Sequence, residues 1–189
     1  ANPLTFLPGN IPISMHIERL LASGNPFVAC YADLNDFKPF NDHYGYWRGD
    51  EMIRLAARLV VAHCDARRDF VGHVGGDDFV LLLQSCNWQQ RLQQVLQQFD
   101  QSVLALFTEG DRLAGGFCVA DRLGQVCFFP LTSVSIGVLH VRPGFFASHY
   151  AVASAATQAK KMAKKQDGSA IYVENGGLAV APAPQPAIV

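Results

Sequence analysis

The four residues Gly75-Gly76-Asp77-Asp78 constrain the fold of this chain more than any other feature of its sequence. They separate two short apolar runs, at 70–74 and 79–83, which are typical of buried strands. Two glycines between such runs predict a tight turn, because glycine adopts backbone angles that other residues avoid. The sequence therefore predicts a β-hairpin with two adjacent carboxylates on an exposed tip.

The rest of the chain alternates between helical and strand-like patterns, read from the spacing of its apolar residues. In order, these patterns predict an amphipathic helix at 11–22, a buried strand at 27–32, a polar loop at 34–50, a helix from Asp50 with acidic residues at its start, the hairpin, a glutamine-rich helix at 87–107, an irregular hairpin between Thr108 and Pro130, a strand at 133–139, a helix near 148–166 and a strand at 170–173. This order predicts an α/β domain in which helices cover one sheet.

Composition excludes several classes of protein. Half of the 189 residues (50%) are hydrophobic and the formal net charge is -1, which favours a folded core and argues against binding to a nucleic-acid polymer. The five cysteines form no CxxC pair, which favours reduced thiols in the cytoplasm over disulfides or zinc. No apolar run reaches the length of a membrane span, so we expect no membrane contact by this domain. We expect the domain to cover 1–174, followed by an Ala/Pro-rich flexible tail at 175–189.

Three carboxylates are expected to meet if the strand at 27–32 pairs with the hairpin. Asp33 follows that strand, and it would then lie near Asp77 and Asp78. Like charges repel unless a cation lies between them, and carboxylate oxygens suit Mg²⁺ or Mn²⁺. The backbone N–H groups of 35–41, together with Lys38, are suited to phosphates. These features predict nucleotide chemistry, although Asp77 and Asp78 taken alone are more often turn residues.

Several motifs in a fixed order carry a resemblance. They are DLNDFKPFND at 33–42, GYWRGD at 45–50, VGGDDF at 74–79, SVSIGV at 133–138 and AKKQDG at 163–168. Together they strongly resemble the GGDEF family of diguanylate cyclase domains, over Leu4 to Val173. With Phe6, Pro39 and Tyr46 beside these motifs, the chain also resembles the GGDEF domains that follow EAL and CBS modules.

The resemblance implies a fold and an activity. The fold is a palm-like central mixed β-sheet flanked by helices, of the nucleotide-cyclase type. The activity is the condensation of two GTP into cyclic di-GMP with release of pyrophosphate, in bacterial second-messenger signalling. It also implies a transient homodimer or a dimer assisted by a partner domain, and flanking sensory or EAL-type modules in a longer protein that can be membrane-associated.

The resemblance also implies roles for individual residues. Asp33, the carbonyl of Leu34, Asp77 and Asp78 would hold Mg²⁺ or Mn²⁺, and Asp77 and Asp78 would be catalytic, with Asp77 assisting deprotonation of the attacking ribose 3′-hydroxyl. The GTP-binding residues would be Phe37 and Lys38 at the terminal phosphates, Lys164 reaching the same phosphates from the last helix, and Asn41 and Asp50 at the guanine edge.

Departures from the family pattern leave two hypotheses open. Asp78 replaces the usual Glu and is one methylene shorter. The last motif is one residue longer than the family pattern and lacks its Arg, so Lys160 competes with Lys164 for the role of phosphate ligand. The product-inhibition motif RxxD is degenerate at 66–69, leaving Asp69 with Arg67 or Arg68 as partial substitutes. The first hypothesis is an active cyclase, and the alternative is a catalytically degenerate GGDEF-like module that binds GTP or a protein partner and regulates attached domains.

Two further departures lie beside the principal motifs. Asn35 replaces the second Asp of the first motif, which removes one acid near the site. His73-Val74 replaces the Arg-Tyr pair that commonly precedes the two glycines. We interpret His73 as a structural residue rather than a catalytic one.

Overall fold

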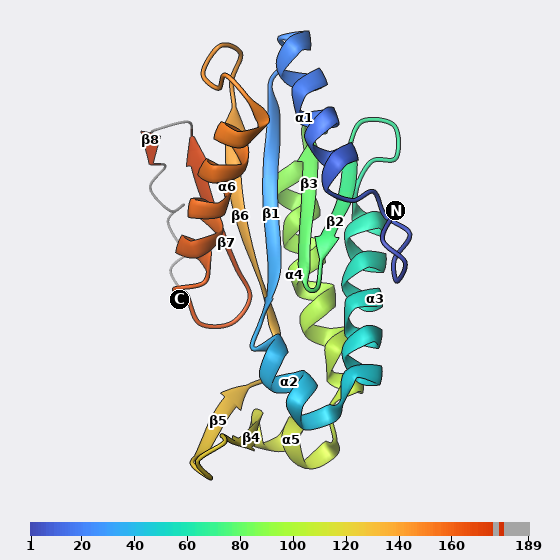
Figure 1. The fold of residues 1–189 in the computed structure, drawn as a ribbon, viewed down its shortest axis with the longest axis vertical. Coiled ribbons are helices and arrows are strands. Elements are labelled where there is room, and N and C mark those ends of the chain that lie inside the picture. Colours follow the sequence, from blue (N-terminus) through green and yellow to red (C-terminus); the bar gives the residue numbers. More distant parts are fainter. Residues whose placement is uncertain (176–177, 180–189) are drawn as a thin grey trace, which may run out of the picture.

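The computed structural model describes residues 1–175 and 178–179. Its centre is a six-stranded sheet in the order β2-β3-β1-β6-β7-β8 (Figure 1). The strands are β1 (Phe27–Asn35), β2 (Phe70–Gly75), β3 (Asp78–Leu83), β6 (Ser133–Val141), β7 (Ala170–Asn175) and β8 (Leu178–Ala179). The β6–β7 pair is parallel and the other pairs are antiparallel, so the predicted mixed sheet is confirmed.

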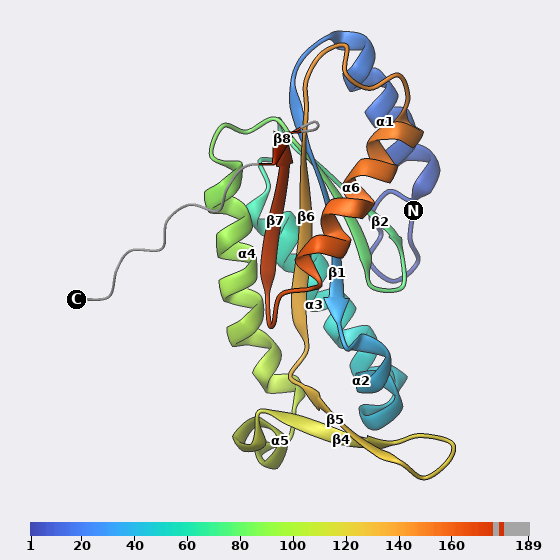
Figure 2. The same ribbon diagram turned by 90° about the vertical axis from the view of Figure 1, so that its left-hand side faces the viewer.

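Helices cover both faces of this sheet. In Figure 2, α1 (Asn10–Ser23) and α6 (His149–Ala163) lie on one side of the sheet and α4 (Trp88–Ser102) lies on the other. Helix α3 (Tyr46–His63) packs beside α4. None of the helices in the described residues is long and apolar enough to cross a membrane.

Two hydrophobic cores follow from the alternation of side chains along β1. Val28 and Cys30 belong to the core under α3 and α4, whereas Phe27 and Ala29 belong to the core under α1 and α6. Successive side chains of a strand point to opposite faces, so a strand that is apolar throughout must be covered on both sides. This explains why the run at 27–32 has no polar alternation.

The predicted polar loop at 34–50 is wrong. Strand β1 continues to Asn35, a helix α2 (Phe37–Tyr44) follows, and α3 begins at Tyr46 rather than at Asp50, with no acidic residue in its first turn. Pro39 made this segment resemble a loop, but it occupies the first turn of α2, where a backbone N–H has no helical partner to lose. Gly45, with φ of 89°, turns the chain between the two helices.

The predicted hairpin is confirmed, and Gly76 at its tip is exposed, but the two carboxylates are not fully exposed. Gly75 pairs with Asp78, which leaves Gly76 and Asp77 as the two turn residues. Gly76 has φ of 54°, a conformation that favours glycine. Asp77 and Asp78 are half-buried, because β3 lies inside the sheet between β2 and β1 and the turn folds against β1.

The segment between Thr108 and Pro130 forms a separate unit at one end of the molecule (Figure 2). It contains α5 (Glu109–Ala114) and a two-stranded sheet of β4 (Gly116–Ala120) and β5 (Val126–Pro130). A short 3₁₀ helix (Val103–Leu106) connects it to α4. Most of the tail expected at 175–189, namely 176–177 and 180–189, lies outside the described residues, whereas Leu178–Ala179 pairs with β7.

Candidate functional site

The pairing of β1 with β3 brings three carboxylates together. Ala32 pairs with Phe79, so Asp33 on β1 lies beside the hairpin turn. The Asp77 carboxylate accepts a hydrogen bond from the backbone N–H of Leu34, at 3.2 Å from Oδ2. Burial raises the pKa of Asp77, and the charges of Asp33 and Asp78 raise it further. The expected meeting of these three carboxylates is therefore present in the structure.

Two lysines at the end of α6, Lys160 in its last turn and Lys164 immediately after it, point into the carboxylate group. Lys160 Nζ lies 3.2 Å from Asp33 Oδ2 and 3.1 Å from Asp78 Oδ1. Lys164 Nζ lies 2.7 Å from Asp33 Oδ1 and 3.2 Å from the Asn35 side-chain oxygen. Burial by itself would lower the pKa of Lys160, but the charges of Asp33 and Asp78 outweigh burial and raise it. The sequence did not decide between Lys160 and Lys164, and in the structure both of them contact Asp33.

A glycine on β6 allows α6 to come this close. A Cβ atom at Gly137 would collide with the backbone of Ala159 and Lys160. Gly137 is a site residue missed from the sequence, although an isolated glycine inside a strand pattern often marks a close approach of another backbone. The position of Lys160 therefore depends on the absence of a side chain at 137.

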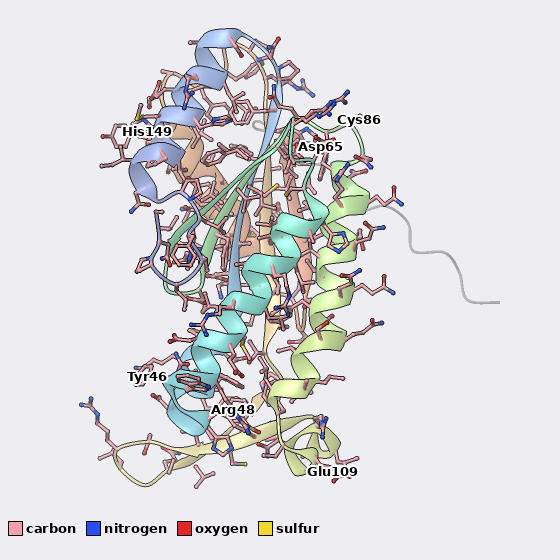
Figure 3. All side chains as sticks on the ribbon, turned by 90° about the vertical axis from the view of Figure 1, so that its right-hand side faces the viewer. Tyr46, Arg48, Asp65, Cys86, Glu109 and His149 are labelled. Atoms are coloured by element: carbon pink, nitrogen blue, oxygen red, sulfur yellow. The ribbon has the colours of Figure 1, made fainter. Side chains whose placement is uncertain are left out.

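An open pocket of about 410 Å³ adjoins the carboxylates. It is lined by Leu34, Asp36, Phe37, Lys38, Pro39, Asn41, Asp42, Tyr46 and Asp77. Figure 3 shows Tyr46 at the beginning of α3, beside α2. Phe37 and Lys38 begin α2, and no side chain caps that end of the helix. Its first N–H groups are thus available to an anion, and the helix dipole favours negative charge there.

Asn41 lines this pocket, whereas Asp50 is not one of its lining residues. In the described part of the chain, Asn41 Oδ1 is buried without a hydrogen-bond partner. A Cβ at Gly49 would collide with that oxygen, so the glycine of the GYWRGD motif makes room for Asn41. Asp50 follows Gly49 on α3 and is exposed.

The Asp69 carboxylate is occupied by bonds within the domain. It accepts hydrogen bonds from the backbone N–H groups of Asp65, Gln84 and Ser85, and from the Ser85 hydroxyl, at 2.8–3.1 Å. These bonds join the end of β3 to the turn that precedes β2. Arg67 and Arg68 are exposed on that turn. Asp69 therefore has a structural role in this fold.

The carboxylate group fits a hard divalent cation by its donor chemistry. Asp33 and Asp77 supply carboxylate oxygens, and Leu34 supplies a backbone carbonyl; these are the ligands that Mg²⁺ and Mn²⁺ prefer. No group of three or more His, Cys, Asp or Glu side chains is arranged around a common metal position within residues 1–175 and 178–179. In this structure the ammonium groups of Lys160 and Lys164 supply the positive charge beside Asp33.

Comparison with known proteins places the chain in a family. The family model described as "Diguanylate cyclase, GGDEF domain" matches residues 3–115. Because this match covers more than half of the chain, the protein belongs to the GGDEF family, whose diguanylate cyclases act in cyclic di-GMP signalling.

Individual relatives agree in the domain but not in their named activities. The chain is 30% identical over 86 residues to the diguanylate cyclase DgcP of Pseudomonas aeruginosa, covering 43% of this chain and 13% of that protein. It is 33% identical over 91 residues to the cyclic di-GMP phosphodiesterase PdeB of Shewanella oneidensis, covering 47% of this chain and 10% of that protein. The chain thus spans only about a tenth of the length of these two curated relatives.

The solved structures share the fold. The GGDEF domain of YfiN (TpbB) from Pseudomonas aeruginosa superposes with a TM-score of 0.65 at 22% identity, covering 91% of this chain and 92% of that one. At this level of identity the likeness concerns the fold alone.

Proposed function

We propose that this chain is a diguanylate cyclase domain that condenses two GTP into cyclic di-GMP and releases pyrophosphate. The observation that carries the proposal is the pocket in which the unpaired N–H groups at the start of α2 lie next to the carboxylate of Asp77. One wall suits the phosphates of a nucleotide and the other suits a divalent cation, which is the combination that phosphoryl transfer requires.

Each residue has a defined task in the proposed reaction. Asp33, Asp77 and the Leu34 carbonyl would hold Mg²⁺ or Mn²⁺, which when bound would stabilise charge on the reacting phosphate. The N–H groups of Phe37 and Lys38 would hold the terminal phosphates. Asp77 would take the proton of the ribose 3′-hydroxyl as that oxygen attacks the α-phosphate of the second GTP, and its raised pKa favours this role.

The remaining assignments concern the base, the last helix and the assembly. Asn41 and Asp50 would bind the guanine edge, and Lys164 would exchange Asp33 for phosphate oxygens when GTP binds. Two GTP molecules require two such sites, so the active form would be a homodimer or a dimer assisted by a partner domain. We place this domain in the cytoplasm, attached to sensory or EAL-type modules.

A catalytically silent, GTP-binding module is the second candidate. Lys160 bonds both Asp33 and Asp78, so an internal cation already neutralises part of the site. Asp78 is also one methylene shorter than the family's Glu, and displacement of a ligand by about an ångström can cost about a hundredfold in rate. Such a module would bind GTP without turnover and regulate the domains attached to it.

The test is incubation of the chain, at high concentration, with GTP and Mg²⁺ or Mn²⁺, followed by chromatography for cyclic di-GMP. We expect product from the wild type, no product from Asp77→Ala, and full activity from Glu51→Ala, an exposed acid on α3. GTP binding by calorimetry without product would favour the silent module. If neither cyclic di-GMP nor GTP binding is detected, both candidate functions are overturned.

A further inference from the structure

The buried side chain of His73 connects the N-terminal segment to the hairpin turn. Its ring is 2% exposed and stacks on Phe79, with centroids 4.4 Å apart and an interplanar angle of 9°. Nε2 lies 2.9 Å from the carbonyl oxygen of Gly76, and Nδ1 lies 2.8 Å from the hydroxyl of Thr5. The backbone N–H of His73 also donates to the carbonyl of Pro8. Both ring nitrogens are therefore engaged.

The chemistry of the two partners fixes the direction of these bonds. A carbonyl oxygen only accepts, so Nε2 carries the hydrogen and donates to Gly76. In a neutral ring Nδ1 is then an acceptor, and the Thr5 hydroxyl donates to it. In the described part of the chain neither ring nitrogen contacts a carboxylate.

The orientation of the Gly76 carbonyl affects the position of the Asp77 carboxylate. It belongs to the peptide that joins Gly76 to Asp77, and Gly76 has the positive φ of 54°. Rotation of this peptide would move the Asp77 carboxylate away from the Leu34 N–H, which it contacts at 3.2 Å. A bond to the carbonyl therefore restrains the carboxylate itself.

We propose that Thr5 and His73 form a hydrogen-bond relay that orients the Gly76–Asp77 peptide and so places the Asp77 carboxylate against β1. His73 is a positioning residue in this relay: the Gly76 carbonyl fixes its tautomer, and Thr5 holds the ring by donating to Nδ1. The relay gives the N-terminal segment a direct influence on the carboxylate group. Its importance for nucleotide chemistry rests on the proposed function, but the relay itself can be tested without GTP.

The first test is ¹⁵N NMR of the His73 ring in the wild-type chain without metal. We expect a hydrogen on Nε2 and a bare, hydrogen-bonded Nδ1. The opposite tautomer, or a ring protonated on both nitrogens, would overturn the relay.

The second test is the affinity for Mn²⁺ alone, measured by electron paramagnetic resonance. Thr5→Ser keeps the donor, Thr5→Val removes it at similar volume, and His73→Phe keeps the stacking and loses both bonds. We expect near wild-type affinity for Thr5→Ser, severalfold weaker binding for Thr5→Val, and about tenfold weaker binding for His73→Phe. Equal affinities in all the variants would contradict the proposal. If His73→Phe does not fold, the comparison of Mn²⁺ affinity between Thr5→Ser and Thr5→Val tests the proposal.

A third measurement separates failure of the relay from failure of the proposed function. If the wild type binds no Mn²⁺, the proposed function fails and the Leu34 amide resonance becomes the reporter. The relay predicts that this resonance moves in Thr5→Val and not in Thr5→Ser. An unmoved Leu34 resonance in Thr5→Val would overturn the relay on its own.

Discussion

Asp77 carries a charge that opposes folding. Burial raises its pKa, as do the nearby charges of Asp33 and Asp78. A carboxyl with a higher pKa in the folded state binds its proton more tightly there, so its contribution to stability is lost as the pH rises through that pKa. At neutral pH, ionised Asp77 therefore destabilises the metal-free domain. Groups retained at such a cost are typical of functional sites.

We therefore expect Asp77→Asn to stabilise the metal-free domain at neutral pH, by up to about 1 kcal/mol or about 2–4 °C in Tm. The amide oxygen still accepts from Leu34 while the charge is lost. The gain should shrink at acidic pH, where wild-type Asp77 becomes protonated. Thermal unfolding in EDTA measures this, and Asp121→Asn on the exposed β4–β5 turn is the control. A loss of stability at neutral pH in Asp77→Asn would contradict the expected sign.

At the scale of elements, the packing of α6 on β6 sets the electrostatics of the site. Gly137 lets the helix backbone touch the strand, and this contact places Lys160 between Asp33 and Asp78. Protein interiors are close-packed, so a single added methyl group must displace one of the two elements. Because β6 lies in the middle of the sheet between β1 and β7, the helix is the element that moves.

We expect Gly137→Ala to cost about 1–3 kcal/mol in the free energy of unfolding, measured with urea. Lys160→Met should then have a smaller effect in the Gly137→Ala background than in the wild type, because the ion pairs are already lengthened. Gly110→Ala is the matched control, since nothing lies within 4 Å of a Cβ at that position. Additive effects of Gly137→Ala and Lys160→Met would show that the helix had not moved.

At the scale of the whole molecule, an aromatic cluster joins the β4–β5 unit to the main domain. Phe117 on β4 is 1% exposed, and its ring stacks on His43 of α2 at 5.1 Å between centroids. It also lies 6.4 Å from Phe40 and 6.1 Å from Phe129. Since α2 forms one wall of the pocket, this cluster connects the projecting unit to the candidate site.

We expect Phe117→Ala to destabilise the domain by about 3–5 kcal/mol and to speed hydrogen exchange in α2. Phe128→Ala is the control from the same hairpin, because Phe128 lies on the opposite face and is 56% exposed. Unfolding in urea and exchange followed by mass spectrometry measure the two effects. Protection of α2 that is equal in both variants would show that the hairpin packs independently of the site.

Local patterns were sufficient for most of the fold. The hairpin, the buried strands and the amphipathic helices follow from the spacing of apolar residues and from glycine at the turn, because these preferences act over a few residues. The meeting of Asp33 with Asp77 also followed, once β1 was expected beside the hairpin. Helix α2 was missed, because Pro39 and the polar residues around it are equally compatible with a loop.

Only the tertiary structure decided which side chains of the site contact one another. Several contacts join residues that are far apart in the sequence: those of Lys160 and Lys164 with Asp33, the three bonds from Gln84 and Ser85 to Asp69, and the contact of His73 with Thr5. Such contacts depend on how closely helices and segments pack on the sheet, as at Gly137, and not on local preference. The sequence therefore specified which chemical groups are present, and packing specified which of them touch.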